Sequence, residues 1–153
     1  NIIVKYGMES PQMDSINEII AITDSINMLQ FEKIINQYGW TNKRLVGEDA
    51  ANKAFIIILH APLIYQKKYL KMIGEAAHKG DIEEQSIAYL TDKILTKEGK
   101  KQLYGTQLKY DVKTASYKLK PIEDEKNINL RRQKLGMPTI QEYAKSWGID
   151  YKY

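Results

Sequence analysis

The sequence predicts a mainly α protein: a single helical domain of about six helices, with one β-hairpin inserted before the last two helices. Three observations support this prediction. Apolar residues recur at helical spacing up to about residue 98, alternate like strand residues between about 102 and 122, and return to helical spacing afterwards. The 153 residues, 43% of them apolar, suffice for one domain over 1–153 with its core in about 10–148.

The first helix is expected to begin at Ser10-Pro11, because serine suits the N-cap and proline the first helical position. Apolar residues between Met13 and Ile20 form one stripe, and those around Ile34 form a second stripe that is out of phase with it. The segment is therefore either one bent helix or two helices that meet near Asp24-Ser25. Gly39 suits the end of this segment.

The next three helices follow one another closely. Residues 48–61 are apolar on nearly every side, which is typical of a central helix. A buried strand over Phe55–Leu59 is the alternative, but the spacing of the alanines favours a helix. Pro62 ends this helix and begins the next, which Gly80 closes. A third helix runs from about Ile82 to Gly99.

The hairpin and two short helices complete the predicted fold. Residues 108–112 and 117–121 alternate between apolar and polar side chains, as two antiparallel strands would. Residues 128–135 have helical spacing. Thr139 and Glu142 form a capping box, which predicts the start of the last helix.

Composition excludes several classes of function. The net charge of +4 is mild and the lysines are scattered, so nucleic-acid binding is not expected. The absence of cysteine excludes disulfides and thiolate chemistry. Two histidines without metal-ligand spacing predict no metal site, and no cofactor is indicated. The longest apolar run, Ala54–Leu59, is too short to span a membrane.

The polar segment from Gln102 to Gln107 is the centre of the predicted site. It is too polar for a core strand and contains one glycine, Gly105, where a β-bulge would bring both glutamines to the same face. The amides have no titratable proton, so Gln102 and Gln107 would bind substrate or stabilise developing charge. Tyr104 would donate a hydrogen bond, or pack as an aromatic side chain.

His60 and Asp92 are the candidate catalytic residues. His60 ends an apolar helix, where it would act as a general base or a ligand; the alternative is a core or capping histidine. Gln66, on the following helix, would hold its ring. Asp92 would orient His60 or pair with Arg131, and its alternative role is an ion pair with a nearby lysine or arginine.

Arg131 and Arg132 are the candidate anion-binding residues. Neighbouring residues on a helix point in different directions, so only one of the two is expected to reach the site and clamp a carboxylate or phosphate. The sequence does not show which one. Pairing with the acidic residues Glu123–Glu125 is the alternative.

These residues allow two classes of function. The first is a small enzyme or a ligand-binding pocket for a polar or anionic substrate. The second is a non-catalytic module, with a protein partner, in which the same residues form a structural hydrogen-bond network. An open cleft lined by these side chains would favour the first class, and a closed network of paired groups the second. The residues specify no reaction, substrate or oligomeric state.

The order of several motifs resembles a known family over about residues 10–148. These motifs are Asp24-Ser25-Ile26-Asn27, Tyr38-Gly39-Trp40, Val46-Gly47, His60-Ala61, Gln66, Asp92, Gln102-x-Tyr104-Gly105-Thr106-Gln107, Arg131-Arg132 and Gly136-Met137-Pro138. The family is an uncharacterised bacterial one, frequent in Bacteroidetes, described as a domain of unknown function. Its members usually carry aspartate and arginine where this chain has Pro62 and Lys93. The resemblance implies no reaction.

The resemblance also bears on location. Members of that family often follow a leader sequence, and this chain begins at Asn1 rather than methionine. We therefore expect an exported bacterial protein, periplasmic or a lipoprotein whose leader has been removed, with a cytoplasmic location as the alternative.

Overall fold

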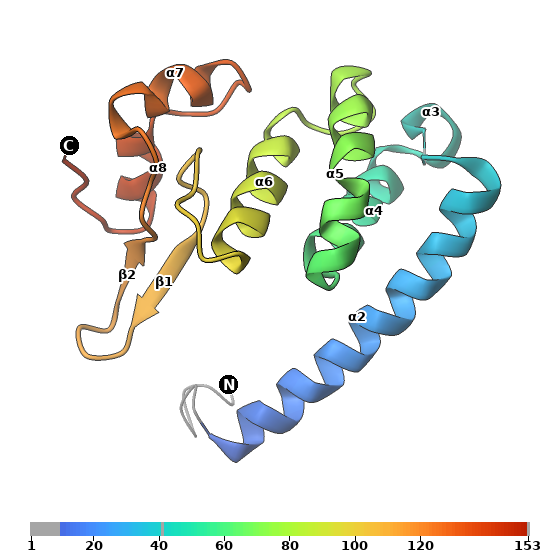
Figure 1. The fold of residues 1–153 in the computed structure, drawn as a ribbon, viewed down its shortest axis with the longest axis horizontal. Coiled ribbons are helices and arrows are strands. Elements are labelled where there is room, and N and C mark those ends of the chain that lie inside the picture. Colours follow the sequence, from blue (N-terminus) through green and yellow to red (C-terminus); the bar gives the residue numbers. More distant parts are fainter. Residues whose placement is uncertain (1–9, 41, 153) are drawn as a thin grey trace.

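The computed structural model describes residues 10–40 and 42–152 and confirms a mainly α fold with a hairpin before the last two helices (Figure 1). The elements are α2 (Pro11–Tyr38), α3 (Lys43–Val46), α4 (Glu48–His60), α5 (Leu63–His78), α6 (Gln85–Lys97), β1 (Leu108–Asp111), β2 (Ser116–Leu119), a 3-10 turn (Glu125–Asn127), α7 (Ile128–Gln133) and α8 (Ile140–Ser146). The four-residue α3 was not predicted from the sequence; it is a single turn, capped by the Asn42 side chain, which accepts from the amide of Arg44.

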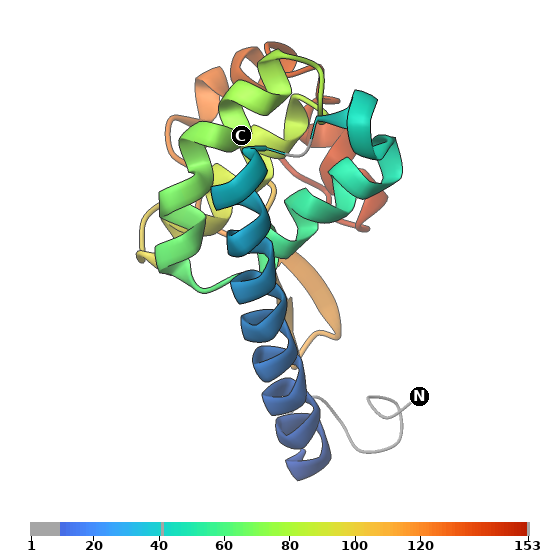
Figure 2. The same cartoon turned by 90° about the vertical axis from the view of Figure 1, so that its right-hand side faces the viewer.

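Helix α2 is continuous, so the two out-of-phase stripes belong to one helix. The Ser10 hydroxyl accepts from the amide of Met13 at 3.3 Å, and Pro11 follows it as predicted. At the other end Gly39 has a φ of 76°, and its N–H closes the last turn on Ile35. Figures 1 and 2 show the N-terminal half of α2 extending away from the remaining helices.

Helix α4 occupies the centre of the helical region, as its apolar surface predicted. It packs against α2, α3, α5 and α6. Ala51, Ala54 and Ile58 are buried on it, and the small alanines allow close approach of the neighbouring helices. The alternative of a strand over Phe55–Leu59 is therefore wrong. The main apolar core also includes Met28, Phe31, Tyr69, Ile73 and Leu90.

The hairpin has a regular antiparallel register that separates two kinds of side chain. Leu108 pairs with Leu119 and Tyr110 with Tyr117, so these residues share one face. Lys109 pairs with Lys118 on the opposite face. A second, smaller apolar cluster of Ile122, Ile128 and Ile140 joins the segment after the hairpin to α7 and α8.

Within residues 10–40 and 42–152, no helix combines the length and the hydropathy that a membrane span requires.

Candidate functional site

Asp92 is the centre of the polar network that the structure forms. It lies on the buried face of α6, one turn after Ala88, and is fully buried. Its carboxylate accepts hydrogen bonds from the amides of Leu103 at 2.7 Å, Tyr104 at 3.0 Å and Thr106 at 2.9 Å. The hydroxyl of Thr106 donates a further bond at 3.0 Å. Residues 103–106 therefore fold around this carboxylate.

The carbonyl groups of the same loop face donors from the C-terminal helices. Arg131 Nε donates to the carbonyl of Leu103 at 2.8 Å, and Arg132 Nη1 donates to that of Tyr104 at 2.5 Å. The hydroxyl of Tyr143 donates to the carbonyl of Thr106 at 3.2 Å. The loop is thus held between Asp92 on one side and α7 and α8 on the other.

Gln102 closes the ends of this loop. Its Oε1 accepts from the amide of Gln107 at 2.8 Å, and its Nε2 donates to the carbonyls of Gln107 at 3.1 Å and Lys120 at 2.7 Å. The side chain therefore pairs with the main chain as a neighbouring strand would. The side chain of Gln107 donates from Nε2 to the hydroxyl of Thr106 at 3.1 Å.

Gly105 is required by both its backbone angle and its surroundings. Its φ of 71° lies in the left-handed region. A Cβ at this position would lie 2.5 Å from Cδ1 of Ile140 and 3.2 Å from that of Ile128. The loop, rather than a bulged strand, brings Gln102 and Gln107 together. The expectation of a bulge was wrong because the amides of Leu103, Tyr104 and Thr106 bind Asp92 instead of a neighbouring strand.

Arg131 and Arg132 have different environments, and the sequence did not show which of them faces inward. Arg132 is fully buried, donates from Nε to the carbonyl of Pro138 at 2.6 Å, and stacks on the ring of Tyr143 at 4.9 Å. Burial lowers its pKa. Arg131 lies at the rim, where it pairs with Asp124 at 3.0 Å, within the acidic stretch considered as its alternative partner.

His60 and Gln66 lie outside this network. His60 is exposed at the end of α4, and the Nε2 of Gln66 donates to the carbonyl of Leu59 at 2.7 Å. Partial burial of the ring lowers the pKa of His60, and the charges of Lys93 and Lys97 lower it further, while Asp24 opposes them. The structure therefore brings together six of the predicted residues: Asp92, Gln102, Tyr104, Gln107, Arg131 and Arg132.

The electrostatics of the network reflect its burial. Burial raises the pKa of Asp92, and the hydrogen bonds from Thr106, Tyr104 and Leu103 act in the opposite direction. Burial also raises the pKa of the Tyr104 hydroxyl, with Asp92 adding to the effect and Arg131 opposing it. Asp92 is the acceptor in each of these hydrogen bonds. The ionised carboxylate, which only accepts, is therefore the form that satisfies all of the donors.

Two residues of the network were missed in the sequence. Thr106 contributes two hydrogen bonds to Asp92, and Tyr143 contributes one bond and one stacked ring. Thr106 lies inside the polar segment and was available to sequence reasoning. Tyr143 follows the buried Ile140 by about one helical turn, so its inward direction was available from the same spacing.

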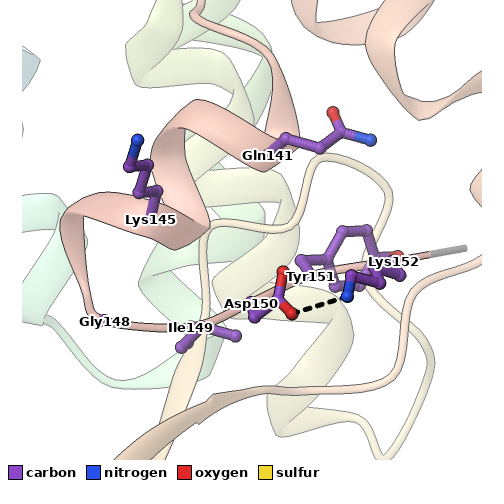
Figure 3. Close-up of a pocket in the computed structure, with 7 residues that line it drawn as sticks. All are labelled: Gln141, Lys145, Gly148, Ile149, Asp150, Tyr151 and Lys152. Atoms are coloured by element: carbon purple, nitrogen blue, oxygen red, sulfur yellow. Dashed lines mark ion pairs between the residues drawn. The ribbon is translucent and has the colours of Figure 1, made fainter.

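The structure has surface pockets away from the network. One, of about 600 Å³, lies between α8 and the C-terminal tail, and Figure 3 shows its lining, including the Asp150–Lys152 ion pair at 2.9 Å. Its lining residues are Gln141, Lys145, Gly148, Ile149, Asp150, Tyr151 and Lys152. Another, of about 310 Å³, lies between α6 and the hairpin and is lined by four lysines, Lys100, Lys101, Lys109 and Lys120. Among the described residues, no group of three acidic or histidine side chains is arranged to hold a metal ion.

Comparison with known proteins places the chain in one family. A search of curated proteins and a search of solved structures each found no match. One family model matches the chain, and it covers residues 1–152, which is nearly the whole sequence. The chain therefore belongs to a family of unknown function, DUF6624.

Proposed function

We propose that this domain is a non-catalytic interaction module, in which the network around Asp92 has a structural role. The observation that carries the proposal is the pairing of Asp92 with main-chain donors. Its two oxygens accept hydrogen bonds from the amides of Leu103, Tyr104 and Thr106, so the carboxylate stabilises the conformation of the loop. A general base needs a lone pair that reaches its substrate, and a buried carboxylate that accepts from three main-chain amides and the Thr106 hydroxyl does not offer one.

The remaining polar groups support the same role. Both functional groups of the Gln102 amide bind main-chain atoms, and Arg131 binds the carbonyls of Leu103, Glu123 and Asp124. Buried polar side chains that pair with the main-chain N–H and C=O groups of a loop in this way fix its conformation. In this proposal they position the hairpin, which continues directly from the loop.

The surface that the hairpin presents is aromatic. Tyr110 and Tyr117 lie edge to face with centroids 5.2 Å apart, and Tyr117 and Trp147 do so at 5.1 Å. We name these three residues the aromatic patch; each is about 40% exposed. Tyrosine and tryptophan are enriched among the residues that dominate protein–protein binding energy. The proposed partner is therefore a protein that contacts this patch.

The structural role is tested by the free energy of unfolding of Gln102→Ala, with His60→Ala as the matched control. Truncating Gln102 leaves the main-chain groups of Gln107 and Lys120 unpaired, so we expect a loss of about 1–3 kcal/mol. The exposed His60 should change stability by less than about 0.5 kcal/mol. An unchanged or raised stability of Gln102→Ala would contradict the proposal, because residues retained for a site are often neutral or stabilising when removed.

The partner surface is tested by affinity capture with the parent, with Tyr117→Ser/Trp147→Ser and with Lys109→Ala, a control on the other hairpin face. The proposal expects a protein that the parent and the control retain and the double variant loses, with the circular dichroism of all three unchanged. Capture of the same proteins by the double variant and the parent would exclude the aromatic patch as the interface.

A small anion-binding site beside His60 is a second candidate, favoured by the positive groups around that residue. The charges of Lys93 and Lys97 lower the pKa of His60 and that of Asp24 raises it, and Lys97 Nζ donates to the carbonyl of Ala61 at 3.4 Å. Lys93 is half-buried. Burial lowers its pKa, and so does the charge of Lys97. Titration with inorganic phosphate, followed by the NMR signals of the His60 ring, should then saturate in the parent and not in Lys93→Ala. A titration without saturation would exclude this candidate.

A further inference from the structure

Helix α2 carries a row of large apolar side chains that the described part of the chain leaves uncovered. We name Ile19, Ile22, Ile26 and Leu29 the α2 stripe. These residues are 64%, 55%, 50% and 55% exposed, respectively. Their spacing of three, four and three residues is the a/d spacing of a coiled-coil seam.

The α2 stripe faces away from the apolar core. The buried residues of α2 are Met28, Phe31 and Ile35, all in its C-terminal part. Ile22 and Phe31 are about two and a half helical turns apart, so they point in opposite directions. The stripe is therefore not the rim of the core but a second apolar face, on the helix that Figure 2 shows extending from the body. Contiguous exposed apolar surface of this kind marks an interaction site.

The charges of the helix segment that carries the stripe indicate what covers it. From Pro11 to Leu29 the helix contains Asp14, Glu18 and Asp24 and no lysine or arginine. Helices that lie on anionic membrane surfaces have basic polar faces, so this acidic segment does not suit a lipid surface. The first basic residue of α2 is Lys33, at the end of the α2 stripe.

The pattern is complementary to itself. A spacing of three, four and three is the same when read in either direction, so two antiparallel copies place Ile19 opposite Leu29 and Ile22 opposite Ile26 on both sides of a two-fold axis. The same register sets Lys33 opposite Ser15 of the other copy, between Asp14 and Glu18. A parallel pair would set Lys33 against Lys33.

The area is adequate for a specific contact. Each residue of the α2 stripe exposes on the order of 100 Å², so the eight residues of two copies bury about 800 Å². The flanking residues from Ser15 to Lys33 raise the total to about 1,000–1,200 Å², which clears the roughly 1,000 Å² expected of a biological interface and falls at its small, weakly associating end. We propose that α2 is a self-association surface, through which two copies of this chain pair antiparallel along the α2 stripe.

The first test is the mass of the full chain by sedimentation equilibrium over a wide range of concentration, for the parent, Ile22→Asp/Ile26→Asp and the control Ile64→Asp. Ile64 is 73% exposed and belongs to α5, not to the α2 stripe. The parent and the control should be dimers, and the double variant should raise the dissociation constant by about 100-fold or more, because like charges would meet at the seam. Circular dichroism verifies that each variant is folded. A monomeric parent, or a dimer that the double variant does not weaken, overturns the proposal.

The second test concerns the antiparallel orientation and uses the absence of cysteine in the sequence. In the proposed pair, Ser15→Cys mixed with Lys33→Cys forms a disulfide between the two variants. Each variant alone forms none, because its two thiols lie about 27 Å apart along the helix axes at 1.5 Å per residue. Efficient cross-linking of Ser15→Cys with itself would overturn the antiparallel pairing.

Discussion

The two halves of the described chain are held together by different interactions. Helices α2 to α6 pack around an apolar core that includes Ile58, Ile73 and Leu90. Residues 102–152 have only the small cluster around Ile128, and a buried network of Asp92, Gln102 and Arg132 fixes their loop. Apolar packing tolerates small changes of shape, whereas directional hydrogen bonds to a buried charge do not. The second half should therefore be the more sensitive to conservative substitution.

Removal of the central charge should have the largest effect. Asp92→Ala leaves the amides of Leu103, Tyr104 and Thr106 buried without an acceptor, so we expect a loss of about 3–5 kcal/mol in the free energy of unfolding. Denaturation by urea measures it. Asp49→Ala is the control, because Asp49 is exposed and its ion pair with Lys53 is a surface one, contributing at most about 0.5 kcal/mol. Similar losses for the two variants would refute the central role of the Asp92 carboxylate in holding the loop of the second half.

Gly105→Ala should be the next most destabilising change. The left-handed backbone and the contact of the new Cβ with Ile140 together should cost about 2–4 kcal/mol. Gly74→Ala is a matched control in the other half, because Gly74 lies inside α5 with open space around it. That control should gain up to about 1 kcal/mol from helix propensity. Thermal unfolding of both variants gives the comparison, and a neutral Gly105→Ala would contradict the geometry of the loop.

Ile73→Val examines the tolerance of the apolar half. The change deletes one methylene group from a fully buried side chain, so it should cost about 0.5–1.5 kcal/mol. Asp92→Asn is of nearly the same shape, but it removes the charge from the acceptor and turns an amide toward N–H groups, so it should cost more than Ile73→Val. Chemical denaturation of both variants measures the two losses in the free energy of unfolding. Equal losses would contradict the greater sensitivity of the hydrogen-bonded network.

The smallest of these expected effects on stability is a pH dependence at the contact between α5 and the end of α6. Glu98 accepts from Lys67 at 2.6 Å and from Lys100 at 2.7 Å, and the hydrogen bonds from Lys100 and Lys67 lower its pKa from 4.5 to about 2. The folded pKa is below the unfolded one, so this stabilisation is present above about pH 4.5 and is lost as the pH falls toward 2. The difference in unfolding midpoint between the parent and Glu98→Gln should shrink over that range; a constant difference would exclude the linkage.

Local signals were sufficient for much of the fold. Ser10 with Pro11 marked the start of α2, and Thr139 with Glu142 marked that of α8, because a cap depends on residues within one turn. Alternation predicted the hairpin for the same reason. The continuity of α2 was left open, since its first two thirds have no core to select one face.

The sequence named six of the residues in the network around Asp92, but not their arrangement, and it added His60 and Gln66, which lie elsewhere. The partners of Asp92 are mainly backbone amides, which are present whatever the side chain. The side chains of residues 103–106 therefore could not predict these hydrogen bonds. His60 was grouped with Asp92 because it ends an apolar helix, and the fold leaves it exposed. The inward direction of Arg132 depended on where α7 lies against the loop, which is tertiary information.

The placement of the two tryptophans gives each half its own optical reporter. Trp40 lies edge to face with Phe31 at 6.2 Å, beside the apolar core, and Trp147 contacts Tyr117 at 5.1 Å beside the hairpin. Fluorescence of Trp40→Phe and Trp147→Phe variants would therefore follow each half separately during denaturation. Asp92 lies on α6 of one half and binds the loop of the other, so the two transitions should coincide while this joint is intact. Two separate transitions in an Asp92 variant would identify that carboxylate as the source of cooperativity between the halves.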